Sequence, residues 1–378
     1  MLYKNWLVLT LRWRSAFAQD RSFNRFLMIM VGLLATRGRG TLTAAISFFG
    51  QILSWSSDYR IFSRSDWKTS DLFLGVIHEC KSYIQHQKRI VISLDDTGIH
   101  KSSRKIKQVS LMRDPLGPKY RPNLINGIRC LHVIAHIPSE TYQLGSTGIS
   151  IGFELSPPPK KPKKKASEDE WKEYRIAQKT RCLSVCGANL ICNLRKDFDS
   201  VGLLQTILCV VDGGYTNKNF IQRMPETVDM IGRVRKDIRI CLPAEENNKR
   251  KIYGATLPTP ETIRSDDIWP IQNCECFYGK RMRNISFKEI NNILWQNSAG
   301  KRRMRLIIVM PTPYKQPGHK KLRYNAPAYL ITTDLYTPAE ELIQAYFDRW
   351  EIEVLHRDLK THVGLGQVQL WSENSVVR

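Results

Sequence analysis

Four polar residues near the C-terminus have side chains and a spacing that suit chemistry on phosphates. They are Tyr346, Arg349, Glu353 and Lys360, which follow one another at intervals of three, four and seven residues. At about 100° per residue, these intervals keep all four on one narrow stripe of an α-helix. A carboxylate suits a hard cation such as Mg²⁺, whereas arginine and lysine suit phosphate oxygens. A solvated helix face with charge pairs is the alternative, so the interpretation requires partners elsewhere in the chain.

Two apolar runs in the middle of the chain each end in aspartate. Residues 90–94 lead into Asp95 and Asp96. Residues 207–211 lead into Asp212 and a Gly-Gly turn. Both runs predict buried strands of a parallel or mixed sheet, in which catalytic groups commonly lie at the carboxyl ends of strands. An aspartate before glycine is ordinarily only a turn former, but three carboxylates in the order strand, strand, helix indicate a site.

The C-terminal pattern resembles a known family. The run YFDRWEIEVLHRDLK, from Tyr346 to Lys360, meets every spacing of the Tyr-x2-Arg-x3-Glu-x6-Lys signature. That signature marks a subgroup of the DDE transposases of bacterial insertion sequences. The resemblance extends over about residues 89–372, and its blocks occur in the family's order.

Two further blocks of this family have counterparts in the chain. The first block is an Asp-Thr pair after a strand, which Asp96 and Thr97 match. The second is an aspartate followed by glycine and later by an aromatic residue, which Asp212, Gly213 and Phe220 match. The resemblance implies an α/β fold with an RNase H-like core, a mixed five-stranded sheet flanked by helices. It also implies that the protein cuts and joins DNA at transposon ends.

The three acidic positions suit a two-metal reaction. In-line attack on a phosphodiester needs an activated oxygen nucleophile and a stabilised leaving oxygen, and two divalent ions roughly 4 Å apart supply both. We expect Asp96 to bridge two Mg²⁺ ions, for which Mn²⁺ can substitute, while Asp212 and Glu353 each hold one. Asp95 competes with Asp96 for the first position, because successive strand residues point to opposite faces and only one of the two can serve. The Asp-Thr block favours Asp96.

The resemblance also implies residues that contact DNA. It assigns Tyr346, Arg349 and Lys360 to phosphates of the transposon end near the cut. Some members of the family stack a flipped base on an aromatic residue of an insertion domain, and Trp295 is the candidate here, with a core tryptophan as the alternative. The family also implies two DNA partners, the transposon ends and the target, and a homodimer in the active DNA complex.

The composition favours a nucleic-acid partner. Lysine and arginine number 58 against 35 acidic residues, a net charge of +23. Such an excess predicts strong, salt-sensitive attraction to phosphate polymers. An anionic membrane surface is the rival explanation, but no clustered basic amphipathic helix favours it. We therefore expect DNA and no membrane as the partner.

The cysteines and apolar stretches predict an intracellular location. The nine cysteines are an odd number without a metal-site spacing, as expected of a chain in a reducing compartment. Residues 26–34 form an apolar stretch of nine residues, far below the ~20 needed to span a bilayer. We expect a cytoplasmic protein associated with the nucleoid.

The chain divides into four predicted regions. They are an N-terminal helical DNA-binding region (1–86), the first part of the catalytic core (87–228), a β-rich insertion domain (229–327), and the last core strand with the Glu-bearing helix (328–378). Helices are expected at residues 23–34, 42–53 and 71–83, as a helix-turn-helix or as a plain bundle. A hairpin is expected from residues 125–137 and 142–153, with a turn at 138–140. A lysine-rich loop at 160–165, which is a solvated segment able to contact DNA rather than a targeting signal, precedes a helix over 168–194.

The helix that carries the signature has its own start signal. Thr337 is expected as the N-cap, Pro338 as the first helical residue and Glu340 as the capping-box acid. Only eighteen residues follow Lys360, whereas the family usually continues with an assembly region, so we expect either a truncated copy or a reading frame that is an end fragment of a mobile element.

Together these features predict a metal-dependent DDE transposase that nicks the element end and transfers the 3′-hydroxyl to target DNA. One alternative is a truncated, non-catalytic protein that occupies transposon ends and inhibits its full-length parent. Another is an RNase H-like structure-specific nuclease that cuts but does not join.

Overall fold

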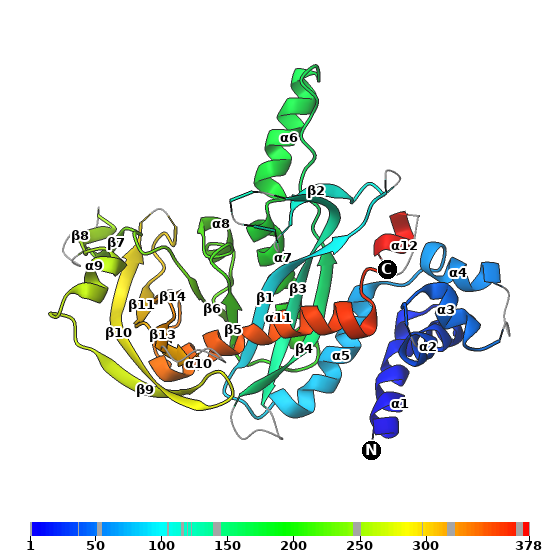
Figure 1. The fold of residues 1–378 in the computed structure, drawn as a ribbon, viewed down its shortest axis with the longest axis horizontal. Coiled ribbons are helices and arrows are strands. Elements are labelled where there is room, and N and C mark those ends of the chain that lie inside the picture. The colour runs from blue at the N-terminus through cyan, green and yellow to red at the C-terminus, as the bar shows by residue number, and fades with distance from the viewer. Residues whose placement is uncertain are drawn as a thin grey trace.

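The structure is a computed structural model in which a large mixed sheet is flanked by helices (Figure 1). It describes residues 2–36, 38–50, 55–103, 106–114, 117–118, 120–121, 123–138, 145–244, 251–296, 298–315, 322–367 and 373–377. Within these ranges no helix has both the length and the apolar content needed to cross a membrane. The chain is therefore a mixed α/β protein, as the sequence predicted.

The helices and strands have the following bounds. The helices are α1 (Leu2–Trp13), α2 (Asp20–Ala35), α3 (Leu42–Ser47), α4 (Trp55–Ser63), α5 (Thr69–Ile84), α6 (Glu168–Thr180), α7 (Leu183–Ser200), α8 (Lys218–Ile221), α9 (Pro260–Ser265), α10 (Ala339–Asp348), α11 (Trp350–Asp358) and α12 (Glu373–Val377), with the 3-10 helix η1 (Arg14–Ala16) and the π-helix η2 (Leu359–Val363). The strands are β1 (Ile90–His100), β2 (Ser110–Arg113), β3 (Leu124–Pro138), β4 (Ser146–Leu155), β5 (Ile207–Val211), β6 (Val228–Arg233), β7 (Ile240–Pro243), β8 (Tyr253–Thr256), β9 (Gln272–Phe277), β10 (Met282–Trp295), β11 (Met304–Val309), β12 (Pro313–Lys315), β13 (Leu322–Tyr324) and β14 (Ala328–Thr332).

Five strands in the order β4-β3-β1-β5-β6 form the part of the sheet that carries the predicted aspartates. β1 runs antiparallel to β3 and parallel to β5, and β5 runs parallel to β6. All five residues of β5 are buried, which explains why the apolar run 207–211 forms a central strand. The predicted hairpin is confirmed as β3 and β4, although residues 139–140 of its turn lie outside the described residues. This order is consistent with an RNase H-like fold.

The same sheet continues beyond β6 through β14, β11 and β10 to β7 and β8. The start of the region predicted as the insertion domain (229–327) lies in β6, which pairs in parallel with β5. β14 pairs antiparallel with both β6 and β11, and β10 then extends the ladder. The strands of the insertion and those of the core are therefore joined by continuous backbone hydrogen bonding.

The side chains of β1 alternate between the two faces of the sheet, and this alternation determines which helices Asp95 and Asp96 face. Ile90, Ile92 and Leu94 belong to the main core cluster, which includes apolar residues of α5 and α7. Val91 instead packs against the second cluster, which includes apolar residues of α10. Because side chains alternate across a strand, Asp95 points to the α10 and α11 face and Asp96 to the α7 face.

The N-terminal helices pack around aromatic residues. Trp13, Phe17, Phe26 and Trp67 form a chain of ring contacts with centroids 5.0 to 5.8 Å apart. The predicted helices at 23–34 and 71–83 are confirmed as α2 and α5. The helix predicted over 42–53 ends at residue 47 as α3, and residues 51–53 of the prediction lie outside the described residues.

Two predicted helix boundaries are wrong. The helix expected over 168–194 is divided into α6 and α7, with Cys182 as the extended N-cap of the second helix. Thr337 does not cap α10, because Pro338 occupies the cap position without a side-chain hydrogen bond. Asp334 organises this start instead, since its Oδ1 accepts the backbone N–H groups of Tyr336 and Thr337 at 2.9 and 3.0 Å.

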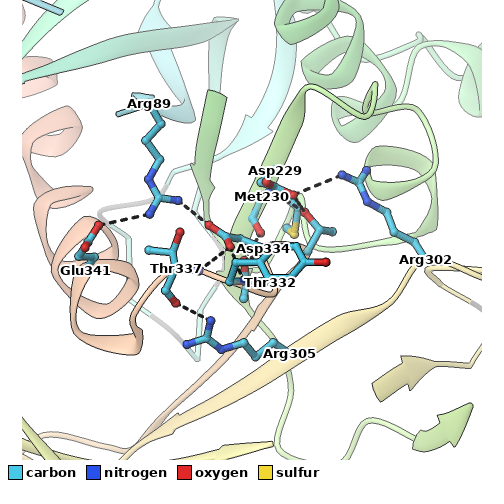
Figure 2. A network of polar contacts seen from close by, with 11 residues as sticks. Arg89, Asp229, Met230, Arg302, Arg305, Thr332, Asp334, Thr337 and Glu341 are labelled. Atoms are coloured by element: carbon cyan, nitrogen blue, oxygen red, sulfur yellow. Dashed lines mark hydrogen bonds and ion pairs between the residues drawn. The ribbon is translucent and has the colours of Figure 1, made fainter. Parts of the chain in front are cut away.

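A buried polar network joins β1, β6 and β14 where α10 begins (Figure 2). Arg89 Nη1 donates to Asp334 Oδ2 at 2.5 Å, and its Nη2 lies 3.5 Å from Glu341 Oε2. Thr333 Oγ1 donates to Asp229 Oδ1 at 2.7 Å, and Arg302 lies 3.6 Å from the same oxygen. Burial raises the pKa of Asp334, but its hydrogen bonds from Thr337, Tyr336 and Arg89 outweigh it and lower the pKa.

We expect Arg89→Met to lower the free energy of unfolding by about 3 kcal/mol, because it leaves the Asp334 carboxylate buried without its cation. The two side chains are 15% and 7% exposed. The loss should be complete above pH ~4 and shrink as the pH falls further, where Asp334 takes up a proton. Urea unfolding at pH 7 and pH 3.5 measures both effects. The matched control is Arg235→Met, whose pair with Asp237 is 83% and 55% exposed and should contribute less than about 1 kcal/mol.

Candidate active site

The three predicted acidic positions converge on one region of the sheet. Asp95 and Asp96 lie within the second half of β1, beside the end of β5. Asp212 follows β5 directly and is exposed, with Gly213 N–H donating to its Oδ1. Figure 1 shows α10 and α11 crossing this part of the sheet, and Glu353 lies in α11. Residues far apart in the sequence are therefore brought together by parallel pairing of β1 and β5.

The signature residues do not lie on one regular α-helix. Arg349 forms the junction between α10 and α11 with φ −49° and ψ −28°, so the backbone continues in the right-handed helical region. After Asp358 the chain changes to the π-helix η2, which contains Lys360. The prediction of a single α-helical stripe is therefore wrong at Lys360, because a π-helix has more residues per turn than an α-helix.

Arg349 connects a carboxylate of the sheet with the carboxylate of the helix. Its Nη2 donates to Glu353 Oε1 at 2.9 Å, one helical turn away. Its Nη1 lies 3.5 Å from Asp95 Oδ2. Asp95 is thus the aspartate on the side of Glu353, and its other oxygen accepts the Asp96 N–H at 2.8 Å. Burial raises the pKa of Asp95 to about 7, against the lowering effects of that amide and of Arg349.

Asp96 has a different set of partners. Tyr215 donates its hydroxyl to Asp96 Oδ1 at 3.2 Å, and the Arg129 guanidinium of β3 is close enough to lower the pKa of the carboxyl. Burial nevertheless raises the pKa of Asp96 overall, and the charge of Asp212 adds to the effect. Asp212 also raises the pKa of Asp95. Although Asp95 and Asp96 point to opposite faces of β1, both therefore lie close enough to Asp212 for its charge to raise their pKa.

Tyr346 and Lys360 have different neighbours around this acidic group. Burial raises the pKa of Tyr346, whose charged neighbours include Arg349, Asp212 and Glu353. Lys360 is exposed and lies near Cys130 of β3, the cross-strand partner of Thr97. The structure thus places Tyr346 and Arg349 beside the acidic residues and Lys360 near the β3 side of Asp96. Trp295 lies elsewhere, at the end of β10, where it packs against the main core cluster.

The donor set fits a divalent cation in its chemistry. Carboxylate oxygens are the ligands that Mg²⁺ prefers. The charges of Asp96 and Asp212 raise the pKa of Asp95, and the charge of Asp212 raises the pKa of Asp96. As the side chains lie, no group of three or more His, Cys, Asp or Glu residues in the described ranges is arranged to hold a metal ion. Arg349 occupies the space between Asp95 and Glu353 instead.

Sequence reasoning missed several residues that support this region. Tyr215, in the turn after Asp212, donates a hydrogen bond to Asp96, and the charge of Arg129 on the neighbouring strand lowers the pKa of Asp96. The one local signal was the position of Tyr215, three residues after Asp212, in the run already identified as the second block. Arg129 has no such signal, because it is brought there by the antiparallel register of β1 and β3.

Buried histidines also lie between β3 and α11. His132, the cross-strand partner of Asp95, stacks on His356 with ring centroids 4.9 Å apart. His136 bonds Ser93 Oγ at 2.7 Å and Ser146 Oγ at 2.8 Å. Burial lowers the pKa of His132 to about 3 and that of His136 to about 4. Burial likewise lowers the pKa of His356 to about 4. All three are therefore neutral imidazoles near pH 7, and the His132–His356 pair packs α11 onto the sheet whereas His136 joins β3 to β1 and β4.

These histidines should make the fold less stable in acid. Between pH ~6.5 and ~4 these histidines bind protons in the unfolded chain but stay neutral in the folded chain. The free energy of unfolding therefore falls as the pH falls through this window. His136→Gln should reduce the difference in unfolding free energy between pH 7 and pH 5 by about 2 kcal/mol. Urea unfolding at both pH values measures it, with the exposed His78→Gln as control. An unchanged difference would show that His136 is protonated in the folded protein.

Comparison with known proteins agrees with this geometry. The family model of the transposase DDE domain matches residues 189–378, which include Asp212 and Glu353. No curated protein matches the chain significantly. The matched region covers half of the chain and spans β5, the extended sheet and the helices α10 and α11. The chain therefore belongs to the transposase DDE domain family.

Proposed function

We propose that this transposase cuts DNA at the ends of its element and joins the freed 3′-hydroxyl to target DNA, with Asp96, Asp212 and Glu353 as the metal-holding residues. The single observation that supports the proposal is that Arg349 links Asp95 of β1 to Glu353 of α11 beside Asp212, with Asp96 adjacent in the same strand. Asp95 and Asp96 both lie within electrostatic reach of Asp212, while Arg349 joins Asp95 to Glu353. The RNase H-like description of the core belongs to the same proposal.

We assign the metal-holding role to Asp96 rather than to Asp95. Both oxygens of Asp95 are already engaged, one by the Asp96 amide and the other by Arg349. Asp96 lies on the side of Tyr215 and Arg129 and directly precedes Thr97. In this assignment Asp95 neutralises Arg349 when no DNA is bound.

The remaining roles follow from charge and position. Two Mg²⁺ ions, when bound, would activate the attacking oxygen and stabilise the leaving oxygen of the phosphodiester. Arg349 exchanges its carboxylate partners for phosphate oxygens, which accept a bidentate guanidinium well. Tyr346, close to the charges of Asp212 and Glu353, donates its hydroxyl to a neighbouring phosphate. Lys360 is exposed and binds phosphate as a point charge.

The test uses purified protein and a linear duplex that contains the reading frame's own flanking DNA with its terminal repeats. With Mg²⁺ or Mn²⁺ we expect cuts at the repeat ends and joining of the 3′ ends to a second plasmid, and with EDTA neither. Cutting without joining would favour the structure-specific nuclease. Specific binding to the ends without cutting in either metal would favour the non-catalytic inhibitor.

A further inference from the structure

A basic arm stands out from the sheet beside the proposed active site. We define it as residues 156–182, which comprise an extended segment after β4 and the helix α6 (Figure 1). None of the thirteen residues of α6 is buried. The helix is held locally by the capping box of Ser167 and Glu170, in which Glu170 N–H donates to Ser167 Oγ at 3.2 Å. A helix without a packed face is maintained either by solvent or by a partner.

The arm carries a net positive charge. Between residues 160 and 181 there are nine lysines and arginines and four acidic residues, a net charge of 9 − 4 = +5. All nine basic side chains are exposed: Lys160, Lys161, Lys163, Lys164, Lys165, Lys172, Arg175, Lys179 and Arg181. None of the nine forms an ion pair with a residue that the structure describes. Their charge is therefore available to a polyanion.

The extended segment and α6 enclose a hollow of about 930 Å³. Its walls carry Lys160, Lys161, Lys163 and Lys165 from the segment, and Glu170, Glu173 and Arg181 from the helix side. Lys164 and Lys172 do not line the hollow and extend the positive charge around it. The positive charge is therefore concentrated on the wall formed by the segment, and a row of exposed lysines there suits the phosphodiester backbone of a nucleic acid better than a small anion.

Both ends of the arm are attached to residues around Asp96. At the first end, Ser156 N–H donates to the Arg129 carbonyl at 2.8 Å, and Arg129 Nε donates to the Ser156 carbonyl at 2.9 Å. Arg129 is the guanidinium that lowers the pKa of Asp96. At the second end, Gly187 in α7 packs against Tyr215, whose hydroxyl bonds Asp96. The base of the arm therefore lies beside residues that interact with Asp96.

We propose that the arm binds the phosphate backbone of duplex DNA next to the active site, without reading its sequence. The choice of DNA as the occupant rests on the proposed function. Five of the nine cations are lysines within six residues, and lysine acts as a point charge on phosphate rather than as a reader of base edges. The arm thus contributes affinity and holds the duplex against the site, while the chemistry stays with the acidic residues.

The test replaces Lys160, Lys161, Lys163, Lys164 and Lys165 with glutamine in the full chain. The probe is a fluorescent 40-base-pair duplex of arbitrary sequence, and anisotropy gives Kd at several KCl concentrations. Each phosphate contact contributes about 0.9 to the slope of log K against log salt, so the slope should fall by about 2 to 4. Replacement of the same five lysines with arginine should leave the slope unchanged. The double variant Asp169→Asn and Glu173→Gln should tighten binding, because it removes negative charge from the same arm.

Two further readouts separate this inference from the proposed function. At saturating DNA the five-glutamine variant should cut repeat ends at the wild-type rate, because the acidic residues are intact. Circular dichroism should show an unchanged fold, since the replaced side chains are exposed. An unchanged salt slope would overturn the inference even where the wild type cuts DNA. Loss of binding to vesicles of 30% phosphatidylserine with undiminished DNA binding would assign the arm to a membrane and overturn it as well.

Discussion

Glu353→Gln should lower the rate of DNA cutting by about a thousandfold while leaving DNA binding intact. Glutamine keeps the size of the side chain and can still accept the hydrogen bond that Arg349 donates at 2.9 Å. It removes the negative charge that a divalent cation requires, and loss of one preorganised electrostatic group in an active site has an effect of this order. Single-turnover cutting of a repeat-end duplex, with anisotropy for binding, measures the two quantities.

The matched control for this variant is Glu351→Gln on the same helix. Glu351 is partly buried beside Gly148 of β4 and lies on the side of α11 away from Arg349. Its replacement should change cutting less than about threefold. Equal losses for the two variants would mean that the helix, rather than the Glu353 carboxylate, had been damaged. Undiminished cutting by Glu353→Gln would remove this residue from the reaction.

The second large effect concerns the adjacent aspartates of β1. Asp96→Asn should lower cutting by about a thousandfold, whereas Asp95→Asn should lower it about tenfold or less. Asp95→Asn also removes one carboxylate partner of Arg349, so DNA binding should become tighter. Both variants are nearly isosteric and lie in the same strand, which makes each the control for the other. The reverse order of the two losses would transfer the metal-holding role to Asp95.

Much of the site was predictable because its signals are local. The runs 90–94 and 207–211 lie in β1 and β5, and Asp212 follows β5 as expected, whereas β1 continues past Asp95 and Asp96 to His100, so these two aspartates lie inside the strand and not at its end. The family signature likewise placed Arg349 and Glu353 one helical turn apart, which the 2.9 Å hydrogen bond between them reflects. Hydrophobic periodicity and residue spacing predict such arrangements because each arrangement depends on residues that are neighbours in the sequence.

Other features depended on pairing that spacing does not encode. Arg129 reaches Asp96 through the register of β3 on β1, which is fixed by packing over the whole sheet. The choice between Asp95 and Asp96 required knowledge of which helices cover each face. The start of α10 was mispredicted because a distant guanidinium and the Asp334 side chain, rather than the local Thr-Pro motif, organise the turn. The change to a π-helix at Leu359 has no sequence signal that we recognise.

The unbroken strand ladder from β4 to β10 has a mechanical consequence. Each interstrand step along it is held by backbone hydrogen bonds, so the acidic edge and the distal β-rich half have no hinge between them. A bending motion of one half against the other would have to rupture β6 from β14 or β14 from β11.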